Sequence, residues 1–212
     1  MRPRRAARGA ALAAALLLAG CGADSVYAPL DEVRARAWAA PGPATLTLIT
    51  AINNRSGSGG HSALMVSGSQ RVIFDPAGTW WHPTAPERGD VKYGITPQIL
   101  DFYTDYHARP TYHVVMQEVV VDPDLAERAL RLVQAHGPAS KATCGQSVSG
   151  LLQELGFAQV RRAWFPDRIM RDFATVPGVT ETRIYDDTVD PWSPERPGVA
   201  RIEDDGVVFD DG

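Results

Sequence analysis

The sequence contains little cysteine, little lysine and no long hydrophobic segment. Cys21 and Cys144 are the only cysteines among 212 residues, too few for a disulfide-stapled fold. Lys92 and Lys141 are the only lysines. The longest apolar run, residues 10–19, is shorter than the roughly 20 residues of a membrane-spanning helix. These absences exclude a multi-pass membrane protein, and the 44% hydrophobic content is typical of a globular domain.

The charge of the chain is acidic once its first segment is set aside. The net charge is −4, but the first 20 residues hold four arginines and no acid. The remainder therefore has 25 acidic against 17 basic residues, a net charge of −8. No basic run occurs after the first nine residues. A nucleic-acid partner is therefore not expected, because such partners require a basic surface.

The N-terminus has the pattern of a bacterial export signal. A cationic stretch, residues 1–9, precedes the apolar run and the tetrapeptide Leu18-Ala19-Gly20-Cys21, which resembles a lipobox. The resemblance implies a signal peptide over residues 1–20, cleavage before Cys21 and lipidation of the Cys21 sulfur. The alternative is a plain secretory signal that happens to end at a cysteine.

Lipidation of Cys21 would anchor the protein to a lipid bilayer without a transmembrane segment. Gly22 stands where an inner-membrane retention signal would place Asp, so the rules for such lipoproteins favour the outer membrane, facing the periplasm. A lipidated Cys21 cannot form a disulfide, which leaves Cys144 as a lone thiol in an oxidising compartment. Cys144 is then either a reactive residue or a buried small hydrophobe.

The order of strand and helix patterns predicts one α+β domain over residues 44–185. Residues 21–43 are expected to tether it to the membrane, with a short helix within residues 30–38. The acidic residues 186–212 are expected to be a flexible tail. Alternating or β-branched segments predict strands at Thr45–Ile52, His61–Val66, Arg71–Phe74, Tyr112–Val121 and Thr180–Tyr185. Short adjacent strands joined by tight turns imply an antiparallel sheet packed against helices.

Four helices are expected between and after these strands. Proline at the first helical position and apolar spacing of three and four residues indicate their bounds. They cover residues 97–106, 123–136, 144–155 and 166–173. In the third, Val148, Leu151, Leu152 and Leu155 form the buried face, and Cys144 stands in the first turn on the same side.

A cysteine at a helix N-terminus is in a place that favours the thiolate. The unpaired N–H groups and the positive end of the helix dipole lower the thiol pKa, and the same N–H groups stabilise an oxyanion. A nucleophilic cysteine also needs a base. His61 is the best placed of the five histidines, because Gly59-Gly60 turns the chain into a strand whose first residue is His61. The other interpretation of His61 is a polar residue that ends a loop.

A strand-borne histidine after a glycine-containing loop, followed much later by a cysteine that opens an amphipathic helix, resembles a known superfamily. It is the circularly permuted papain-like superfamily, with NlpC-type and lecithin:retinol acyltransferase-like thiol enzymes. The permuted order has His before Cys, as His61 precedes Cys144. The resemblance implies a polar residue after the next strand that orients the imidazole. Asp75 stands there, although Asp75-Pro76 is also a common turn start.

The residues and the resemblance together lead to one expected function and two alternatives. The expectation is a cell-envelope thiol hydrolase or acyltransferase with Cys144, His61 and Asp75 as catalytic residues, acting on an amide or ester of peptidoglycan or lipid, without a cofactor. The first alternative is a catalytically inactive envelope-binding domain, in which Trp80 and Trp81 stack on sugars. A metal hydrolase is the second, using His61, Asp75, and His107 or His113; no metal-ligand spacing supports it.

Overall fold

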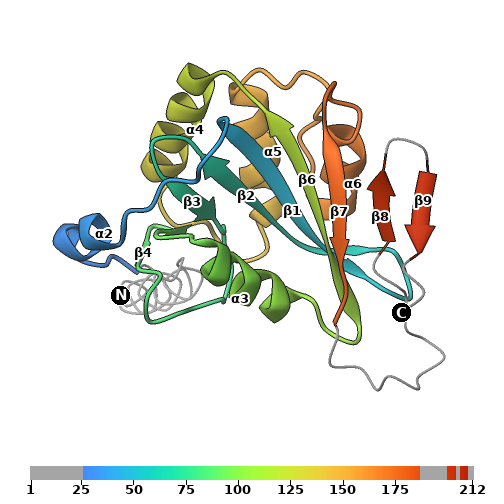
Figure 1. The fold of residues 1–212 in the computed structure, drawn as a ribbon, viewed down its shortest axis with the longest axis horizontal. Helices are drawn as coiled ribbons and strands as arrows, with labels where there is room; N and C mark the ends of the chain where they lie inside the picture. Colours follow the sequence, from blue (N-terminus) through green and yellow to red (C-terminus); the bar gives the residue numbers. More distant parts are fainter. Residues whose placement is uncertain (1–25, 187–199, 204–205, 210–212) are drawn as a thin grey trace, which may run out of the picture.

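The computed structural model describes residues 26–186, 200–203 and 206–209 (Figure 1). They form one antiparallel sheet with helices on both faces, so the α+β class and the antiparallel sheet are confirmed. The strand order is β4-β5-β3-β2-β1-β6-β7-β8-β9. The strands are β1 (Thr45–Asn53), β2 (Gly59–Ser67), β3 (Arg71–Phe74), β4 (Glu87–Arg88), β5 (Val91–Lys92), β6 (Tyr112–Val120), β7 (Thr180–Ile184), β8 (Ala200–Glu203) and β9 (Gly206–Phe209).

Three helices cover one face of the sheet and a single helix covers the other (Figure 1). The first group is α4 (Pro123–His136), α5 (Cys144–Glu154) and α6 (Pro166–Phe173), all of which contact β2 or a neighbouring element. Helix α3 (Pro97–His107) crosses the opposite face and contacts β6. The fifth helix of the described residues, α2 (Leu30–Arg36), lies beyond the edge near β4.

Local sequence signals set the helix bounds. The Thr96 side chain accepts a hydrogen bond from the Ile99 N–H at the start of α3, and Asp122 accepts one from Asp124 N–H at the start of α4. Proline occupies the first turn in α3, α4 and α6, where a missing N–H has no cost. These four predicted helices are confirmed to within a few residues at each end.

The core consists of two apolar layers, one on each side of the sheet. Alternate residues of β1 face opposite layers: Leu46 and Leu48 pack against the helices α4 to α6, whereas Ile49 packs toward α3. The predicted buried face of α5 is confirmed, because Val148 and its three leucine partners are at most 4% exposed. The sheet thus separates α3 from α5, and any site that joins them has to form at an open strand edge.

The segment expected to tether the domain is, in its described part, packed onto it. Val33 of α2 is buried, and the Ala28 N–H donates to the Glu87 carbonyl across 2.8 Å. The Arg71 N–H donates to the Trp38 carbonyl, and the Arg71 guanidinium lies 4.5 Å from the Trp38 ring centroid. Residues 26–43 therefore extend the domain, because their aromatic and apolar side chains cover the sheet edge. The expected short helix is present as α2.

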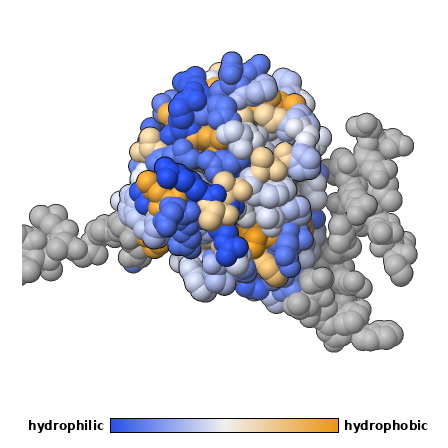
Figure 2. Space-filling view, turned by 60° about the vertical axis from the view of Figure 1, so that its left-hand side comes forward, coloured by the Kyte–Doolittle hydropathy of each residue, from blue (hydrophilic) through white to orange (hydrophobic). Residues whose placement is uncertain are grey.

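The surface beside α2 presents separate small apolar groups among polar side chains (Figure 2). Val26, Tyr27 and Leu30 are its exposed apolar residues, at 46%, 54% and 52%.

The segment expected to be an acidic tail, flexible or loosely docked, contains two strands among its described residues. Strands β8 and β9 form a hairpin, and Thr182 of β7 pairs with Arg201 of β8. The hairpin continues the sheet because the outer edge of β7 offers unpaired backbone groups. The predicted signal peptide and Cys21 lie outside the described residues. None of the described helices has both the length and the apolar character needed to cross a membrane.

Candidate active site

A β-bulge in strand β2 sets the direction of the His61 side chain. Ala51 of β1 pairs with His61, but the next residue, Ile52, pairs with Gly59, so Gly60 is the extra residue. Bulges of this kind bend a strand and redirect its side chains. Gly60 is needed because a Cβ there would lie 2.7 Å from the Tyr112 ring. The His61 side chain is left 18% exposed, on the face that α3 covers.

Asp75 follows β3 directly and holds His61. Its Oδ1 lies 2.6 Å from His61 Nε2 and accepts a second hydrogen bond, of 2.8 Å, from the Tyr103 hydroxyl. The carboxylate is fully buried. Gly78 makes room for it, because a Cβ at that position would overlap the carboxylate. Asp75 therefore has both expected roles. It starts a turn, in which the Gly78 N–H donates to the Asp75 carbonyl, and its side chain contacts the His61 imidazole.

Cys144 is the first residue of α5 and meets His61 at an open strand edge. Strand β3 pairs with β2 only from Leu64 to Ser67, so the first half of β2 is uncovered on that side. There the His61 side chain and the N–H groups of Ser62 and Gly145 lie close enough to the Cys144 sulfur to lower its pKa. Because His61 uses Nε2 for Asp75, Nδ1 is the ring nitrogen left for the sulfur. Cys144 is only 9% exposed.

The surroundings of His61 favour its protonated form. Burial opposes the charge, but the Asp75 carboxylate, by charge and hydrogen bond, and Cys144 outweigh it and raise the His61 pKa to about 10. For Asp75, burial likewise opposes the charge, but His61 outweighs it and lowers the pKa to about 2. The two residues therefore form an imidazolium–carboxylate pair near neutral pH.

The thiolate form of Cys144 is favoured as well. Burial acts against it, but the hydrogen bond and charge of His61, together with the Ser62 and Gly145 N–H groups, lower the Cys144 pKa below that of an ordinary thiol. The Thr143 side chain bonds to the Ser140 carbonyl and does not cap α5. The first-turn N–H groups of α5 are thus left without a capping side chain.

Close packing fixes α5 in this place. A Cβ on Gly145 would overlap the Trp164 carbonyl, so only glycine allows α5 to approach the segment before α6. Ser149, one turn on, donates to the Gly145 carbonyl and accepts from the Ala163 N–H at 3.1 Å. These contacts set the direction in which Cys144 faces.

Asp90 connects the two loops that carry the site. Its Oδ2 accepts hydrogen bonds from the Ala77 N–H, just after Asp75, and from the Ala139 N–H, in the loop before α5. Lys92, only 1% exposed, donates to the Trp80 carbonyl and to Glu87, and its charge also lowers the Asp75 pKa. The sequence analysis missed both residues, because their roles depend on contacts between distant loops.

Two residues of α3, Tyr103 and His107, complete the surroundings of His61. Tyr103, whose hydroxyl donates to Asp75, was missed as a site residue, whereas His107 was considered only as a ligand of the alternative metal hydrolase. His107 stacks on His61, with ring centroids 5.5 Å apart and planes 9° from parallel. The spacing Tyr103-x-x-x-His107 places both on one helix face, a signal that the sequence contains.

The remaining histidines lie elsewhere. His113 binds the Asn54 side chain and stacks on Tyr185. His82 stacks on Trp80 and Phe102, and His136 is exposed at the end of α4.

The structure limits which side chains can take part in binding or catalysis. The side-chain amide of Gln117 donates to Glu181 at 2.9 Å. Trp80 is 3% exposed and packs edge-on to Tyr103, so of the two adjacent tryptophans only Trp81, 71% exposed, is free to stack on a sugar.

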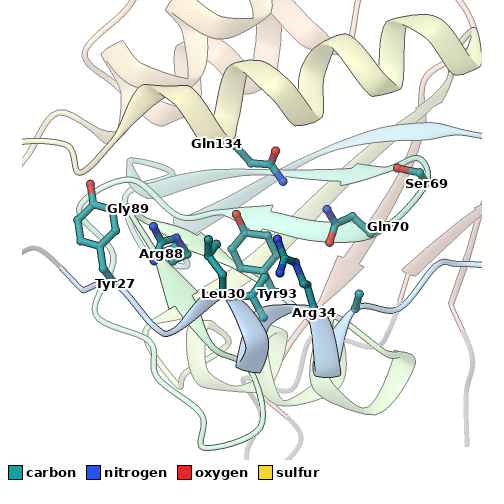
Figure 3. Close-up of a pocket in the computed structure, with 11 residues that line it drawn as sticks. Tyr27, Leu30, Arg34, Ser69, Gln70, Arg88, Gly89, Tyr93 and Gln134 are labelled. Atoms are coloured by element: carbon teal, nitrogen blue, oxygen red, sulfur yellow. The ribbon is translucent and has the colours of Figure 1, made fainter.

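One pocket of the described residues has none of His61, Asp75 and Cys144 in its lining. It has a volume of about 500 Å³ and lies between α2 and the strands, with Arg34, Arg88 and Tyr93 around it and Gln134 reaching toward it from α4 (Figure 3). Another, of about 440 Å³, adjoins the outer side of the first turns of α5, where Thr143 and neighbouring residues line it.

No protein-family model matches the chain, and no curated protein or solved structure is significantly similar to it.

Proposed function

We propose that this protein is a lipid-anchored cell-envelope thiol hydrolase or acyltransferase, with Cys144 as nucleophile, His61 as acid and base, and Asp75 as the residue that orients His61. The observation that carries the proposal is the chain of contacts from Asp75 through His61 to Cys144, with a 2.6 Å Asp75–His61 distance. The three residues come from the start of β2, the loop after β3 and the start of α5. Packing within any one of these elements does not require the three side chains to meet.

The proposed reaction begins with attack of the Cys144 thiolate on an acyl carbon. A carbon–sulfur bond forms, and the negative charge moves to the acyl oxygen, where the N–H groups of the first turn of α5 meet it. The His61 imidazolium then gives its proton to the departing amine or alcohol, and a thioester remains. Neutral His61 next takes a proton from water, or from an acceptor alcohol or amine, which attacks the thioester and releases Cys144.

The arrangement agrees with a circularly permuted papain-like fold, which we propose as the family-level interpretation. His61 precedes Cys144 in the chain, the histidine stands on an antiparallel sheet, and the cysteine opens a helix packed against that sheet. The substrate class remains an amide or ester, as in peptidoglycan peptides or lipids, because Cys and His serve both reactions.

Location in the envelope is proposed from the first 21 residues. The lipobox-like Leu18-Ala19-Gly20-Cys21 places the acyl anchor five residues before Val26, the first described residue. The domain would thus lie close to the bilayer surface.

The low exposure of Cys144 supports the alternative of an inactive envelope-binding domain. Trp81, Trp164 and Phe165 are 71%, 57% and 69% exposed and provide aromatic surface for such binding. A thiol-reactive probe decides between the two functions. The enzyme requires rapid labelling of Cys144 at pH 7 that a peptidoglycan peptide or an ester slows. Labelling no faster than that of a free thiol would contradict the enzyme and favour the binding domain.

A further inference from the structure

Three potential metal ligands converge beside the thiol. His61, Asp75 and His107 each offer a ligand atom, and these atoms all lie within 4.8 Å of one another. Two imidazoles and a carboxylate are the ligands that Zn²⁺ and related divalent ions use in open, three-residue sites. The ligand atoms of a tetrahedral Zn²⁺ lie roughly 3.4 Å apart, so closing on an ion needs only small side-chain shifts.

His107 is oriented as a metal-binding histidine is. Its Nδ1 lies 2.8 Å from the Tyr103 carbonyl, which can only accept, so Nδ1 carries the hydrogen. The other ring nitrogen, Nε2, therefore carries the lone pair that a metal needs. A hydrogen bond from the second nitrogen to a carbonyl is the usual support of a metal-bound histidine.

One carboxylate oxygen of Asp75 accepts no hydrogen bond from the described residues. Oδ1 accepts from Tyr103 and His61, but Oδ2 is buried and has no hydrogen-bond partner. A buried carboxylate oxygen without a partner is unfavourable, and a cation would satisfy it. This observation is independent of the clustering of the ligands.

We propose that His61, Asp75 and His107 bind one divalent transition-metal ion of the zinc class, with water as the fourth ligand. The ion binds His61 Nε2 in place of its proton, which passes to solvent, and the same ion binds the Asp75 carboxylate. Cys144 is not a ligand in this site, because His61 faces the sulfur with its other nitrogen.

Metal binding would switch off the proposed thiol chemistry. A ring whose Nε2 holds a metal carries one proton at most, at Nδ1, and so cannot pass through the imidazolium form that acid–base catalysis needs. This consequence rests on the proposed function, whereas the binding site itself does not. Zinc-class ions would then be reversible inhibitors of the protein.

The binding test uses the purified full chain with both cysteines replaced, Cys21→Ser and Cys144→Ala, so that no thiol contributes. Titration of Zn²⁺ against a chelating dye should give one ion per chain with affinity close to that of the wild type. Adding His107→Gln should weaken binding at least tenfold, whereas His136→Gln, an exposed histidine on α4, should leave it unchanged. His107→Phe keeps the ring stacking on His61 and should weaken binding equally.

Two results would overturn the site. Loss of binding in Cys144→Ala alone would show that the ion is held by the thiol, and unchanged binding in both His107 variants would exclude His107 as a ligand. Co²⁺ gives a second readout: the wild type should show tetrahedral visible bands without the near-ultraviolet sulfur band that Cys144 ligation would produce.

The inhibitory consequence is tested separately on the wild-type chain. Zn²⁺ should slow hydrolysis of an activated ester at least tenfold relative to the metal-free protein, and His107→Gln should reduce this ratio. Binding without any effect on ester hydrolysis would contradict the inhibition while leaving the metal site intact. A chain that binds Zn²⁺ but has an unreactive Cys144 would contradict the proposed function alone.

Discussion

Gly145, the residue after Cys144, lies directly against the main-chain carbonyl of Trp164, with no space for a side chain between them. This contact sets how closely α5 approaches the segment before α6. It therefore fixes the position of the thiol relative to β2.

Gly145→Ala should destabilise the protein by about 1–3 kcal/mol, because the added methyl overlaps backbone that cannot yield easily. Gly150→Ala is the matched control on the same helix. There a Cβ makes only ordinary contact with Arg162, at 3.5 Å, and replacing a helical glycine should stabilise by up to about 1 kcal/mol. Urea unfolding of both variants measures the difference. Equal effects of the two substitutions on stability would show that α5 does not pack closely against Trp164 at Gly145.

His61→Ala should slow alkylation of Cys144 by iodoacetamide at pH 7 by about tenfold, because an ordinary thiol is only a few per cent thiolate at that pH. In the wild type, His61 lowers the Cys144 pKa and keeps the thiolate present. The pH profile of alkylation should move upward in the variant. His136→Ala serves as control and should keep the wild-type profile. If His61→Ala left the pH profile of alkylation unchanged, His61 would not be the residue that lowers the Cys144 pKa.

Asp75→Asn should impair the site less than His61→Ala. The amide still fills the space next to Gly78 but loses the charge that raises the His61 pKa. Alkylation of Cys144 and ester turnover should both fall, with a lower pKa for the imidazole by NMR titration. An unchanged His61 titration would mean that Asp75 acts as a turn residue only.

The His61–Asp75 pair should make stability depend on pH in a defined window. The His61 pKa rises from 6.5 to about 10 on folding, so its contribution is complete below pH 6.5 and is lost as the pH rises through 10. The Asp75 pKa falls from 3.8 to about 2, so its contribution is complete above pH 3.8 and is lost as the pH falls through about 2.

The thermal midpoint of the wild type should therefore exceed that of a His61→Ala, Asp75→Asn double variant most between about pH 4 and 6.5. The difference should shrink toward pH 10. A difference that stays constant from pH 4 to 10 would show that the pair does not titrate as a unit.

Cys21 should be the acylated N-terminus of the mature protein. Cleavage before Cys21 leaves 192 residues, and mass spectrometry of protein extracted from membranes should find a lipid adduct on that residue. Cys21→Ser should block processing and leave the signal peptide attached. An unmodified N-terminus at another residue would refute the lipobox.

Much of the fold could be predicted because its signals are local. Proline at a first helical position and apolar spacing placed α4 and α6 at their observed bounds, since a helix start and a buried stripe depend on neighbours within a few residues. The strands β4 and β5 were not predicted. They have two residues each, and they form because β5 pairs with the edge of β3 and β4 pairs with β5.

The sequence by itself determined which residue types could carry chemistry: a lone Cys144 at a helix start, His61 at a strand start and Asp75 after the next strand. Only the tertiary structure decided that they meet, because this requires β3 to leave the edge of β2 open opposite α5. Tyr103, His107 and Asp90 join the same site through contacts between residues 13 to 49 positions apart in the sequence. Side-chain position at that range is set by packing of whole elements, which local periodicity does not encode.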